Sequence, residues 1–361
     1  MSMAIQQAKL GSGKVSPNPL VGAVILKNDE LASTGFHKKF GDKHAEINAI
    51  NSALENGIDT EGSTLIVNLE PCSHQGKQPP CVNAIIESGI SKVVIGMTDP
   101  NPLVAGQGIK QLNDAGIETE VGVLEDECMW LNRFFIKHIT EEMPYIIVKH
   151  AQSLNGAIAD QYGKSKWISS EESLKNVHKL RAELDAVGIG KGTALTDNPS
   201  LTVRLVDGRN PYRILFDTNL ATPLDFKLFK DDNRMRTIVL CGNQAQNSRK
   251  IDILKTAGVM IEECELNDEF RIDIESALKK LYKKYNIGSI LIEGGNNLLN
   301  SFAKINIADE YHTFIAPMVV AEGTNAFQGE FVTPSLDNSL KLRFKNVSKS
   351  GDDIYLISLK R

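Results

Sequence analysis

The sequence predicts an α/β protein built from two domains. Short apolar segments rich in β-branched residues alternate with helical segments along the chain, which is typical of helices packed around a mixed or parallel sheet. A length of 361 residues allows two separate hydrophobic cores. The polar stretch Glu141-Glu142-Met143-Pro144 lies between two such alternating series. We therefore expect one domain at residues 1–143 and a second at residues 144–361.

Hydrophobic periodicity gives the elements of the first domain. In order, we expect a helix at 1–8, strands at 21–26 and 32–35, a helix at 44–55, a strand at 64–68, a helix at 81–88, a strand at 92–96, a helix at 108–115, a strand at 118–123 and one helix over 124–140. Gly89 ends one of these helices, and the turn Asp99-Pro100-Asn101-Pro102 follows a strand.

The same pattern restarts in the second domain. We expect strands at 145–149, 186–190, 213–217, 237–241, 289–292, 312–316 and 355–359, with helices at 171–181, 272–285 and 297–305. In an open α/β sheet, ligands bind beyond the carboxyl ends of the strands, so we expect both sites where strands end and helices begin.

The composition limits the class of function. The net charge of −5 and the pI near 5.9 argue against a dedicated nucleic-acid-binding surface. No apolar run approaches the length of a membrane span, and the N-terminal residues lack the apolar core of a signal peptide. Three of the five cysteines (Cys128, Cys241 and Cys264) are scattered, which indicates reduced thiols. We expect a cytoplasmic protein without nucleic-acid or membrane partners.

One histidine and two cysteines form the clearest chemical motif. His44-Ala45-Glu46 is followed by Pro71-Cys72 and then by Cys81. An imidazole and two thiolates suit Zn²⁺ and leave its fourth position for a water that ionises near neutral pH. Glu46 is placed to move protons without binding the metal. The combination matches the pattern of zinc deaminases, so His44, Cys72 and Cys81 are predicted zinc ligands and Glu46 a predicted catalytic residue.

The cysteine spacing departs from that pattern, because eight residues rather than two separate Cys72 from Cys81. Both thiolates can reach one ion if the insert loops out and Cys81 begins a helix. A lone histidine would more often be a structural residue, but the neighbouring Pro-Cys favours a ligand. The alternative is a structural zinc site, although such sites usually have four protein ligands and no fourth is evident.

Two segments of the second domain suit a phosphate. The stretch 290–299 is a strand, the turn Glu293-Gly294-Gly295 and a helix start, whose free N–H groups favour an anion. It is not the dinucleotide fingerprint, and an ordinary tight turn explains it equally well. The stretch 197–204 ends in Arg204, which suits a sugar phosphate or a surface ion pair. Lys149, in an apolar strand, and Trp167 each fit packing as well as a site.

The two sets of motifs together resemble a known family over nearly the whole chain, the bifunctional riboflavin-biosynthesis proteins. The matching motifs of the first half are Ser16-Pro17-Asn18-Pro19-Leu20-Val21-Gly22, His44-Ala45-Glu46, Leu69-Glu70-Pro71-Cys72-Ser73-His74, Pro79-Pro80-Cys81 and Asp99-Pro100-Asn101-Pro102. Those of the second half are Ser153-Leu154-Asn155-Gly156, Lys166-Trp167-Ile168-Ser169, Asp197-Asn198-Pro199, Leu201-Thr202-Val203-Arg204 and Glu293-Gly294-Gly295. The longer cysteine spacing is normal in this family.

The resemblance implies a cytidine-deaminase-like α/β/α sandwich followed by a dihydrofolate-reductase-like α/β domain. The first would deaminate 2,5-diamino-6-ribosylamino-4(3H)-pyrimidinone 5′-phosphate with zinc-bound hydroxide. The second would reduce the ribosyl group of that product to ribityl with NADPH. The resemblance also suggests a homo-oligomer.

The resemblance also carries site residues over to this chain. It implies NADPH contacts at Gln152, Trp167, Thr193, Asp197, Gly295, Asn296, Asn297, Leu298, Leu299, Asn300 and Ser301, and substrate contacts at Ser165, Arg181, Leu201, Arg204, Thr218 and Glu293. Asn18, fixed between two prolines, is expected to orient the base or ribose. Lys149 and Asp197 are the expected catalytic groups of the reductase. Asn155, where many relatives have Asp, and Asn296-Asn297, where Pro-Thr is common, are departures.

Two other functions compete with this interpretation. A zinc deaminase acting on nucleic acid, with a C-terminal binding domain, would need a basic groove and stacking aromatics, which an acidic chain with 6% aromatic residues supplies poorly. A non-catalytic zinc module that binds a nucleotide would have four protein ligands on the metal.

Overall fold

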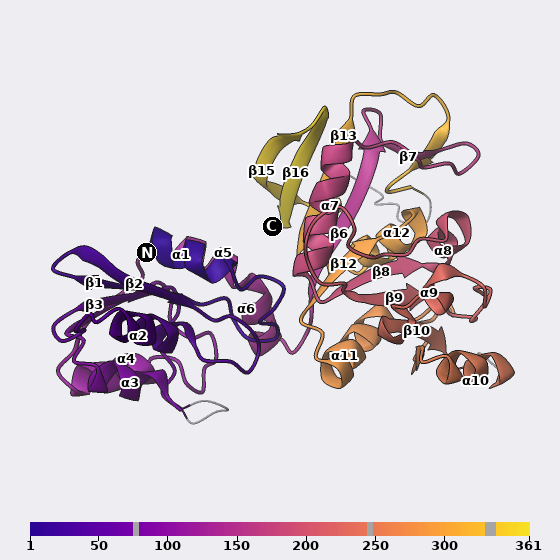
Figure 1. Ribbon diagram of the computed structural model, residues 1–361. Coiled ribbons are helices and arrows are strands. Elements are labelled where there is room, and N and C mark those ends of the chain that lie inside the picture. Colours follow the sequence, from indigo (N-terminus) through magenta and orange to yellow (C-terminus); the bar gives the residue numbers. More distant parts are fainter. Residues whose placement is uncertain (75–78, 244–247, 329–336) are drawn as a thin grey trace. The chain divides into compact units, whose positions relative to one another are not determined.

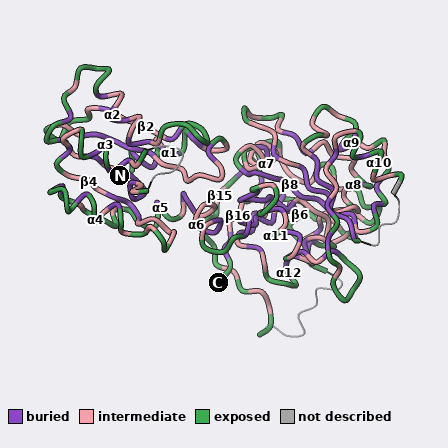
Figure 2. The backbone as a smooth tube through the Cα atoms, turned by 90° about the horizontal axis from the view of Figure 1, so that it is seen from below, coloured by how far each residue is buried: buried purple, intermediate pink, exposed green. Residues whose placement is uncertain are grey.

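The computed structural model describes residues 1–74, 79–243, 248–328 and 337–361 (Figure 1). The chain forms two compact units, Met1–Glu142 and Met143–Arg361. Across the described residues, no helix combines the length and apolar character needed to cross a bilayer. Figure 2 shows that burial is concentrated in the strands of each unit, while loops and outer helix faces are exposed.

The first unit contains a sheet in the order β2-β1-β3-β4-β5, as far as its described residues extend. Its elements are α1 (Ser2–Lys9), β1 (Gly22–Lys27), β2 (Glu30–Phe36), α2 (Ala45–Glu55), β3 (Thr64–Val67), α3 (Cys81–Glu87), β4 (Lys92–Ile95), α4 (Gln107–Asp114), β5 (Glu118–Val121), α5 (Glu125–Leu131) and α6 (Arg133–Thr140). Strand β1 is antiparallel to both neighbours, whereas β3, β4 and β5 are parallel. The mixed sheet confirms the predicted sandwich.

Two apolar cores lie on opposite faces of this sheet (Figure 1). On one face, α2, α3 and α4 pack on the strands through residues such as Ala49, Ile85 and Leu112. On the other, α1 and α5 pack through Ala8 and Cys128. The strand residues alternate between these cores, as expected for a sheet covered by helices on both faces.

The prediction of one helix over 124–140 is wrong, because the structure has two helices that meet at Asn132. The Asn132 backbone leaves the helical region, with φ −100° and ψ 15°. Its buried side-chain amide accepts a hydrogen bond from Leu20 N at 2.8 Å and donates one to Leu20 O at 3.1 Å. This pairing with a distant loop satisfies the amide and interrupts the helix, which local periodicity does not reveal.

The second unit contains a larger sheet, in the order β11-β10-β9-β8-β12-β6-β13-β16-β15 in its described part. Its elements are β6 (Tyr145–Ser153), β7 (Ala157–Asp160), α7 (Glu171–Glu183), β8 (Ala186–Gly190), α8 (Lys191–Asp197), β9 (Tyr212–Phe216), α9 (Lys227–Lys230), η1 (Arg234–Arg236), β10 (Thr237–Gly242), α10 (Ser248–Thr256), β11 (Met260–Cys264), α11 (Ile274–Tyr285), β12 (Ser289–Glu293), α12 (Asn296–Lys304), β13 (Glu310–Ala316), β14 (Gly323–Asn325), β15 (Leu342–Ser350) and β16 (Asp353–Lys360).

From β11 to β13 in this order, each strand is parallel to its neighbours, and β16 is antiparallel to both β13 and β15. Helices α11 and α12 pack on one face through residues such as Leu278, Leu281 and Phe302. All the strands and helices predicted for this half are present, but several elements were not predicted, among them β7, α8, α10, β11 and β15. The parallel arrangement brings the ends of β8 and β12 to one edge of the sheet.

Asn155 shows why its departure from the family pattern is tolerated. Its side chain accepts hydrogen bonds from Ser153 Oγ at 2.7 Å and Val320 N at 3.1 Å, and donates one to Val320 O at 2.8 Å. An aspartate in the same place could accept the first two bonds but, when ionised, could not donate the third. The amide therefore holds the turn before β7 to the segment after β13.

Arg213 on β9 is the largest fully buried side chain in the described chain. Its guanidinium donates to both carboxylate oxygens of Asp231, at 2.6 and 2.8 Å, and to Thr237 Oγ1. It also donates to the carbonyls of Ser200 and Leu228, at 3.0 and 2.9 Å. A buried ion pair is favourable only when its remaining donors are also satisfied, and here the carbonyls and Thr237 satisfy them. The bond to the Ser200 carbonyl fixes the loop that contains Ser200 to the sheet.

Replacing Arg213 with Met should destabilise the second unit by about 3 kcal/mol, because the substitution leaves the Asp231 carboxylate without its cationic partner and the Ser200 carbonyl without its donor. The loss is measured from denaturant unfolding followed by far-ultraviolet circular dichroism. Lys279→Ala, on an exposed helix face where Lys279 pairs with Glu275, is the control and should leave the midpoint unchanged. Equal stability of the two variants would contradict the role given to Arg213.

Candidate active sites

Three side chains from separate elements meet in the first unit. His44 caps the N-terminus of α2, Cys81 is the first residue of α3, and Cys72 lies on the loop after β3. Their ligand atoms all lie within 4.8 Å of one another. Each residue thus stands at a helix start or beyond a strand end, as the sequence predicted for the site.

The distances in this cluster fit a tetrahedral zinc ion. His44 Nδ1 lies 3.2 Å from Cys81 Sγ and 3.5 Å from Cys72 Sγ. With zinc bonds of about 2.0–2.1 Å to nitrogen and 2.3 Å to sulfur, ligand atoms at a tetrahedral angle are about 3.6 Å apart. The backbone N–H of Cys81 donates to Cys72 Sγ at 3.3 Å. Hydrogen bonds with Cys81 and His44 lower the pKa of Cys72 against the effect of burial, which favours the thiolate that a metal needs.

Glu46 lies in the first turn of α2, beside this cluster, and is 3% exposed. Its Oε2 has no hydrogen-bond partner in the described structure. Burial and the neighbouring Cys72 raise the pKa of Glu46 to about 7, although His44 opposes the shift. A buried carboxyl group that titrates near neutral pH suits general acid–base catalysis.

Asn18 is held beside the cluster by His37. The Asn18 amide donates to His37 Nε2 at 3.1 Å, and His37 Nδ1 donates to the carbonyl of Lys43, also at 3.1 Å. The His37 ring lies edge-on to the ring of His44, with centroids 5.5 Å apart. Since this arrangement uses the amide nitrogen of Asn18, its side-chain oxygen remains available to a ligand.

Glu70 fixes the loop that carries Cys72. This buried carboxylate accepts backbone N–H groups from Asp99 and Gly106 at 3.0 Å, and from Gly108 and Ile109 at 2.9 and 3.3 Å. The contacts join the segment after β3 to the loop after β4 and the first turn of α4. A side chain at Gly108 would meet the carbonyl of Pro71 at 2.2 Å, so this close approach requires glycine.

A large cavity lies at the carboxyl ends of β8 and β12 in the second unit. Its volume is about 1130 Å³, more than the usual 300–1,000 Å³ for one drug-sized ligand. Fifteen of the residues that the family resemblance or the mechanism predicted line it: Lys149, Ser165, Trp167, Arg181, Thr193, Asp197, Leu201, Arg204, Thr218, Glu293, Gly295, Asn296, Asn297, Leu298 and Ser301. The predicted residues therefore converge on a cavity large enough for two ligands.

An ion pair lies in the wall of this cavity. Arg181 donates to both oxygens of Glu293, at 2.6 and 2.8 Å, and to the carbonyl of Thr202 at 3.3 Å. Glu293 ends β12 and lies beside Lys149 in the register with β6. Burial and the nearby Arg181 lower the pKa of Lys149, and Glu293 opposes this shift. The ammonium of Lys149 is therefore more acidic than that of an ordinary lysine.

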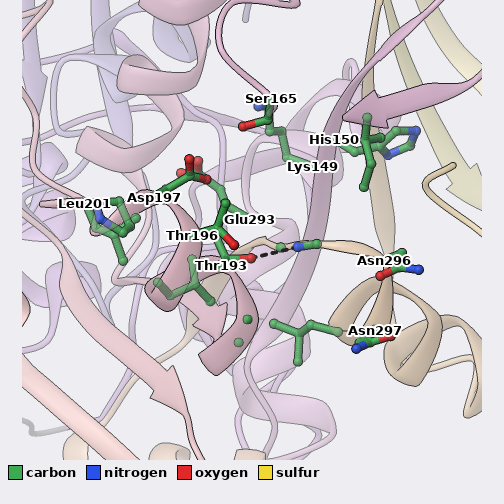
Figure 3. A pocket seen from close by; sticks show the side chains of 18 of the residues that line it. Lys149, His150, Ser165, Thr193, Thr196, Asp197, Leu201, Glu293, Asn296 and Asn297 are labelled. Atoms are coloured by element: carbon green, nitrogen blue, oxygen red, sulfur yellow. Dashed lines mark hydrogen bonds between the residues drawn. The ribbon is translucent and has the colours of Figure 1, made fainter. Parts of the chain in front are cut away.

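The N-terminus of α12 forms another part of the cavity wall (Figure 3). Gly295 donates its N–H to Thr193 Oγ1 at 2.9 Å, which joins α12 to α8. Asn296 and Asn297 begin the helix beside this contact (Figure 3). Since Gly295 has no side chain, its backbone is open to a ligand, and the helix dipole favours a negative group there.

Three of the predicted cofactor contacts lie outside this cavity. Leu299 is fully buried in the core of the second unit. Asn300 lines a neighbouring cavity of about 640 Å³ and donates to the carbonyl of Gln328 at 2.6 Å. Gln152 contacts His150 Nε2 at 3.2 Å through its side-chain oxygen. The helical period of α12 explains the first two, because only some faces of the helix point toward the cavity.

Sequence reasoning missed three residues that shape the sites, namely Glu70, His37 and His178. Glu70 acts through backbone N–H groups and His37 through the side-chain amide of Asn18. Such contacts produce no recognisable spacing of residue types in the sequence. His178 lines the cavity of the second unit from α7. Its place three residues before Arg181, on the same helix face, was the available signal.

Two family models match this chain. Residues 1–97 match the cytidine and deoxycytidylate deaminase zinc-binding region, and residues 144–356 match the RibD C-terminal domain. The second match covers more than half of the chain.

Known relatives match over the full length. The riboflavin biosynthesis protein RibD of Aquifex aeolicus is 41% identical over 99% of this chain and 96% of its own, and that of Escherichia coli is 33% identical over 99% and 97%. A solved structure from Thermotoga maritima, described as a diaminohydroxyphosphoribosylaminopyrimidine deaminase/5-amino-6-(5-phosphoribosylamino)uracil reductase, has a TM-score of 0.88 at 38% identity, covering 100% and 97% of the two chains. Acinetobacter baumannii RibD has a TM-score of 0.88 at 34% identity, with the same coverage.

Replacing Cys72 with Ala should abolish stable metal binding. Wild-type protein dialysed against a weak chelator is expected to keep about one zinc per chain, and the variant to keep almost none, because only two of the three ligands remain. Elemental analysis gives the stoichiometry. Cys128→Ala is the matched control, since Cys128 is a buried residue of α5 outside the cluster. Full zinc content in the Cys72 variant would refute the ligand assignment.

Proposed function

The chain belongs to the RibD family of riboflavin biosynthesis proteins, and we propose that its two sites carry out successive steps on one phosphorylated pyrimidine. It is a bifunctional deaminase and reductase of the riboflavin pathway. The observation that carries the proposal is the presence, in one chain, of a three-ligand cluster beside Glu46 and a separate cavity lined by Lys149, whose pKa is lowered. The substrate is 2,5-diamino-6-ribosylamino-4(3H)-pyrimidinone 5′-phosphate.

In the first step, we assign zinc to His44, Cys72 and Cys81, whose spacing suits a tetrahedral ion. Zinc, when bound, supplies the Lewis acidity that makes water a nucleophile at neutral pH. Glu46 accepts the proton of the attacking water, and its pKa near 7 allows it to release that proton again.

Glu46 then passes protons to the pyrimidine ring nitrogen and to the departing amino group. The bond from ring carbon to the amino nitrogen breaks, the new carbon–oxygen bond becomes a carbonyl, and ammonia leaves. Asn18, oriented by His37, directs its amide oxygen to the base or ribose. Each proton thus has a donor and an acceptor in the site.

In the second step, we assign NADPH and the deaminated product to the large cavity. NADPH, when bound, supplies a hydride to C1 of the ring-opened ribose. Asn296 and Asn297 offer backbone N–H groups at a helix N-terminus to a phosphate of the cofactor, and the bond from Gly295 N–H to Thr193 holds this turn in place. Trp167 is 72% exposed at the cavity edge, where its ring can cover a bound ligand.

A residue of the chain must supply the proton that accompanies the hydride in this reduction. In the ring-opened ribose, C1 is doubly bonded to the nitrogen that joins it to the pyrimidine, so a hydride at C1 leaves that nitrogen in need of one proton. Lys149 donates this proton, since burial makes its ammonium acidic. Asp197 pairs with Lys166 at 3.6 Å and orients the ribose hydroxyls. Arg204, Ser165, Leu201 and Thr218 bind the phosphoribosyl part.

We also propose a cytoplasmic location and self-association. All five cysteines are free, and two of them must stay reduced to bind a metal. Exposed apolar side chains on β15 and β16, including Phe344, Val347 and Ile354, support contact with another copy of the chain.

Glu46→Gln should keep zinc bound but lose deamination by about 10²–10⁴-fold, because the amide cannot shuttle protons. Ammonia release from the diamino substrate without NADPH gives the rate. The reductase, assayed with deaminated substrate, should be unchanged. If the variant deaminates at the wild-type rate, Glu46 is not the acid–base.

Lys149→Met should reduce NADPH oxidation by about 10²–10⁴-fold and leave deamination intact, since it removes the proton donor. In the wild type, reduction should fall as pH rises through the lowered pKa of Lys149, because only the ammonium donates. Stopped assays of both half-reactions across pH test this. Lys345→Met, on exposed β15, is the control. An unchanged pH profile in the Met variant would assign the proton to another group.

A further inference from the structure

His178 is a buried histidine of the second unit that the mechanism above does not use. It lies on α7, three residues before Arg181, and is 5% exposed. Its ring lines the large cavity. Ring Nδ1 accepts the backbone N–H of Arg204 at 2.9 Å and, more weakly, that of Leu205 at 3.5 Å.

These contacts fix the tautomer of the ring. A backbone N–H can only donate, so Nδ1 must be the acceptor and the proton resides on Nε2. Within the described residues, no group hydrogen-bonds to Nε2, and Nε2 is not enclosed by protein. Since a donor in a largely buried ring is costly to leave unsatisfied, Nε2–H is available to an acceptor that binds in the cavity.

The surroundings of His178 indicate what that acceptor is. Its charged neighbours are Arg181, Arg204 and Glu293. Burial and the two arginines lower the pKa of His178 to about 4, so the ring is a neutral donor at physiological pH. Arg181 is neutralised by its two bonds to Glu293, whereas Arg204 contacts Thr202 Oγ1 at 2.8 Å and keeps its charge. A positive group beside a neutral donor suits an anion with several acceptor oxygens.

We propose that His178 binds the 5′-phosphate of the reductase substrate through Nε2–H, beside Arg204, while its Nδ1 holds the backbone of Arg204 in place. The same imidazole thereby orients the loop that carries Arg204 and contacts the phosphate that this loop binds. The proposal rests on the reductase function given above and adds a phosphate ligand to it. The cofactor is the other source of phosphate, and the experiment separates the two.

The test compares His178→Asn with His178→Gln. Asparagine can place its side-chain oxygen near the position of Nδ1 and keep the bond to Arg204, but it has no donor at the position of Nε2. Glutamine can place a donor near Nε2 and loses the acceptor. We expect the Asn variant to raise the KM for phosphorylated substrate and the Ki for ribose 5-phosphate about tenfold or more, consistent with loss of a hydrogen bond to a charged group. The KM for NADPH should not change.

Each outcome decides between roles. Unchanged KM and Ki in the Asn variant would reduce His178 to a support for the loop and overturn the proposal. A rise in the KM for NADPH alone would assign Nε2–H to the cofactor and also overturn it. Recovery of substrate KM in the Gln variant would support a direct donor. Wild-type protein that fails to oxidise NADPH with deaminated substrate would instead refute the proposed reductase function.

A measurement on the wild-type protein avoids any folding defect in the variants. With ¹⁵N-labelled histidine, adding ribose 5-phosphate should shift the Nε2 resonance of His178, while adding ribose should not. A resonance unmoved by ribose 5-phosphate at saturating concentration would contradict the proposal. Deaminase activity, which resides in the other unit, serves as the control for intact protein.

Discussion

The ion pair between Arg181 and Glu293 is the interaction on which the second site depends. It joins α7 to the end of β12, and both side chains are mostly buried, with 12% and 14% exposure. Burial opposes a charge on Glu293, yet Arg181 lowers its pKa below the ordinary value. Because the carboxylate stays ionised, it supports the ammonium of Lys149 beside it. The third bond of Arg181, to Thr202 O, extends this support to the loop that carries Arg204.

In the first site, hydrogen bonds from backbone N–H groups, rather than an ion pair, hold the loop that carries Cys72 in place. Glu70 receives four of them and ties the loop before Cys72 to the start of α4. His44 and Cys81 stand at helix starts, where short-range structure already fixes the direction of the side chain. A metal can then bind without a large rearrangement, since the three ligand atoms already lie within 4.8 Å.

Much of the fold could be predicted because β-branched apolar runs form the buried strands. Strand β15 could not, because an edge strand pairs on one side only and its residues are mostly exposed and polar. Helix α8 is short and contains Gly192, which weakens any helical signal. The break at Asn132 depends on Leu20, 112 residues away in sequence, so no local pattern contains it.

The candidate sites divide in the same way. Ligand spacing and family motifs predicted the cluster around His44 and fifteen of the residues that line the large cavity. Leu299 was predicted to contact the cofactor as part of the continuous run 295–301. In a helix only one face of such a run meets the cavity, and Leu299 lies in the core instead. His178 was not found, because its function depends on Nδ1 meeting the backbone of Arg204, 26 residues later. Contacts between a side chain and distant backbone carry no residue-type signature.

Two buried glutamates show how one chain supports two kinds of chemistry. Glu46 lies beside a thiol cluster, and burial with a negative neighbour raises its pKa to about 7. Glu293 is also largely buried but faces Arg181, and its pKa is lowered. The first can therefore exchange protons at neutral pH, whereas the second keeps its charge and holds a cationic group in position. The two roles follow mainly from the neighbours of each carboxyl group, because the residue type is the same and both groups are largely removed from solvent.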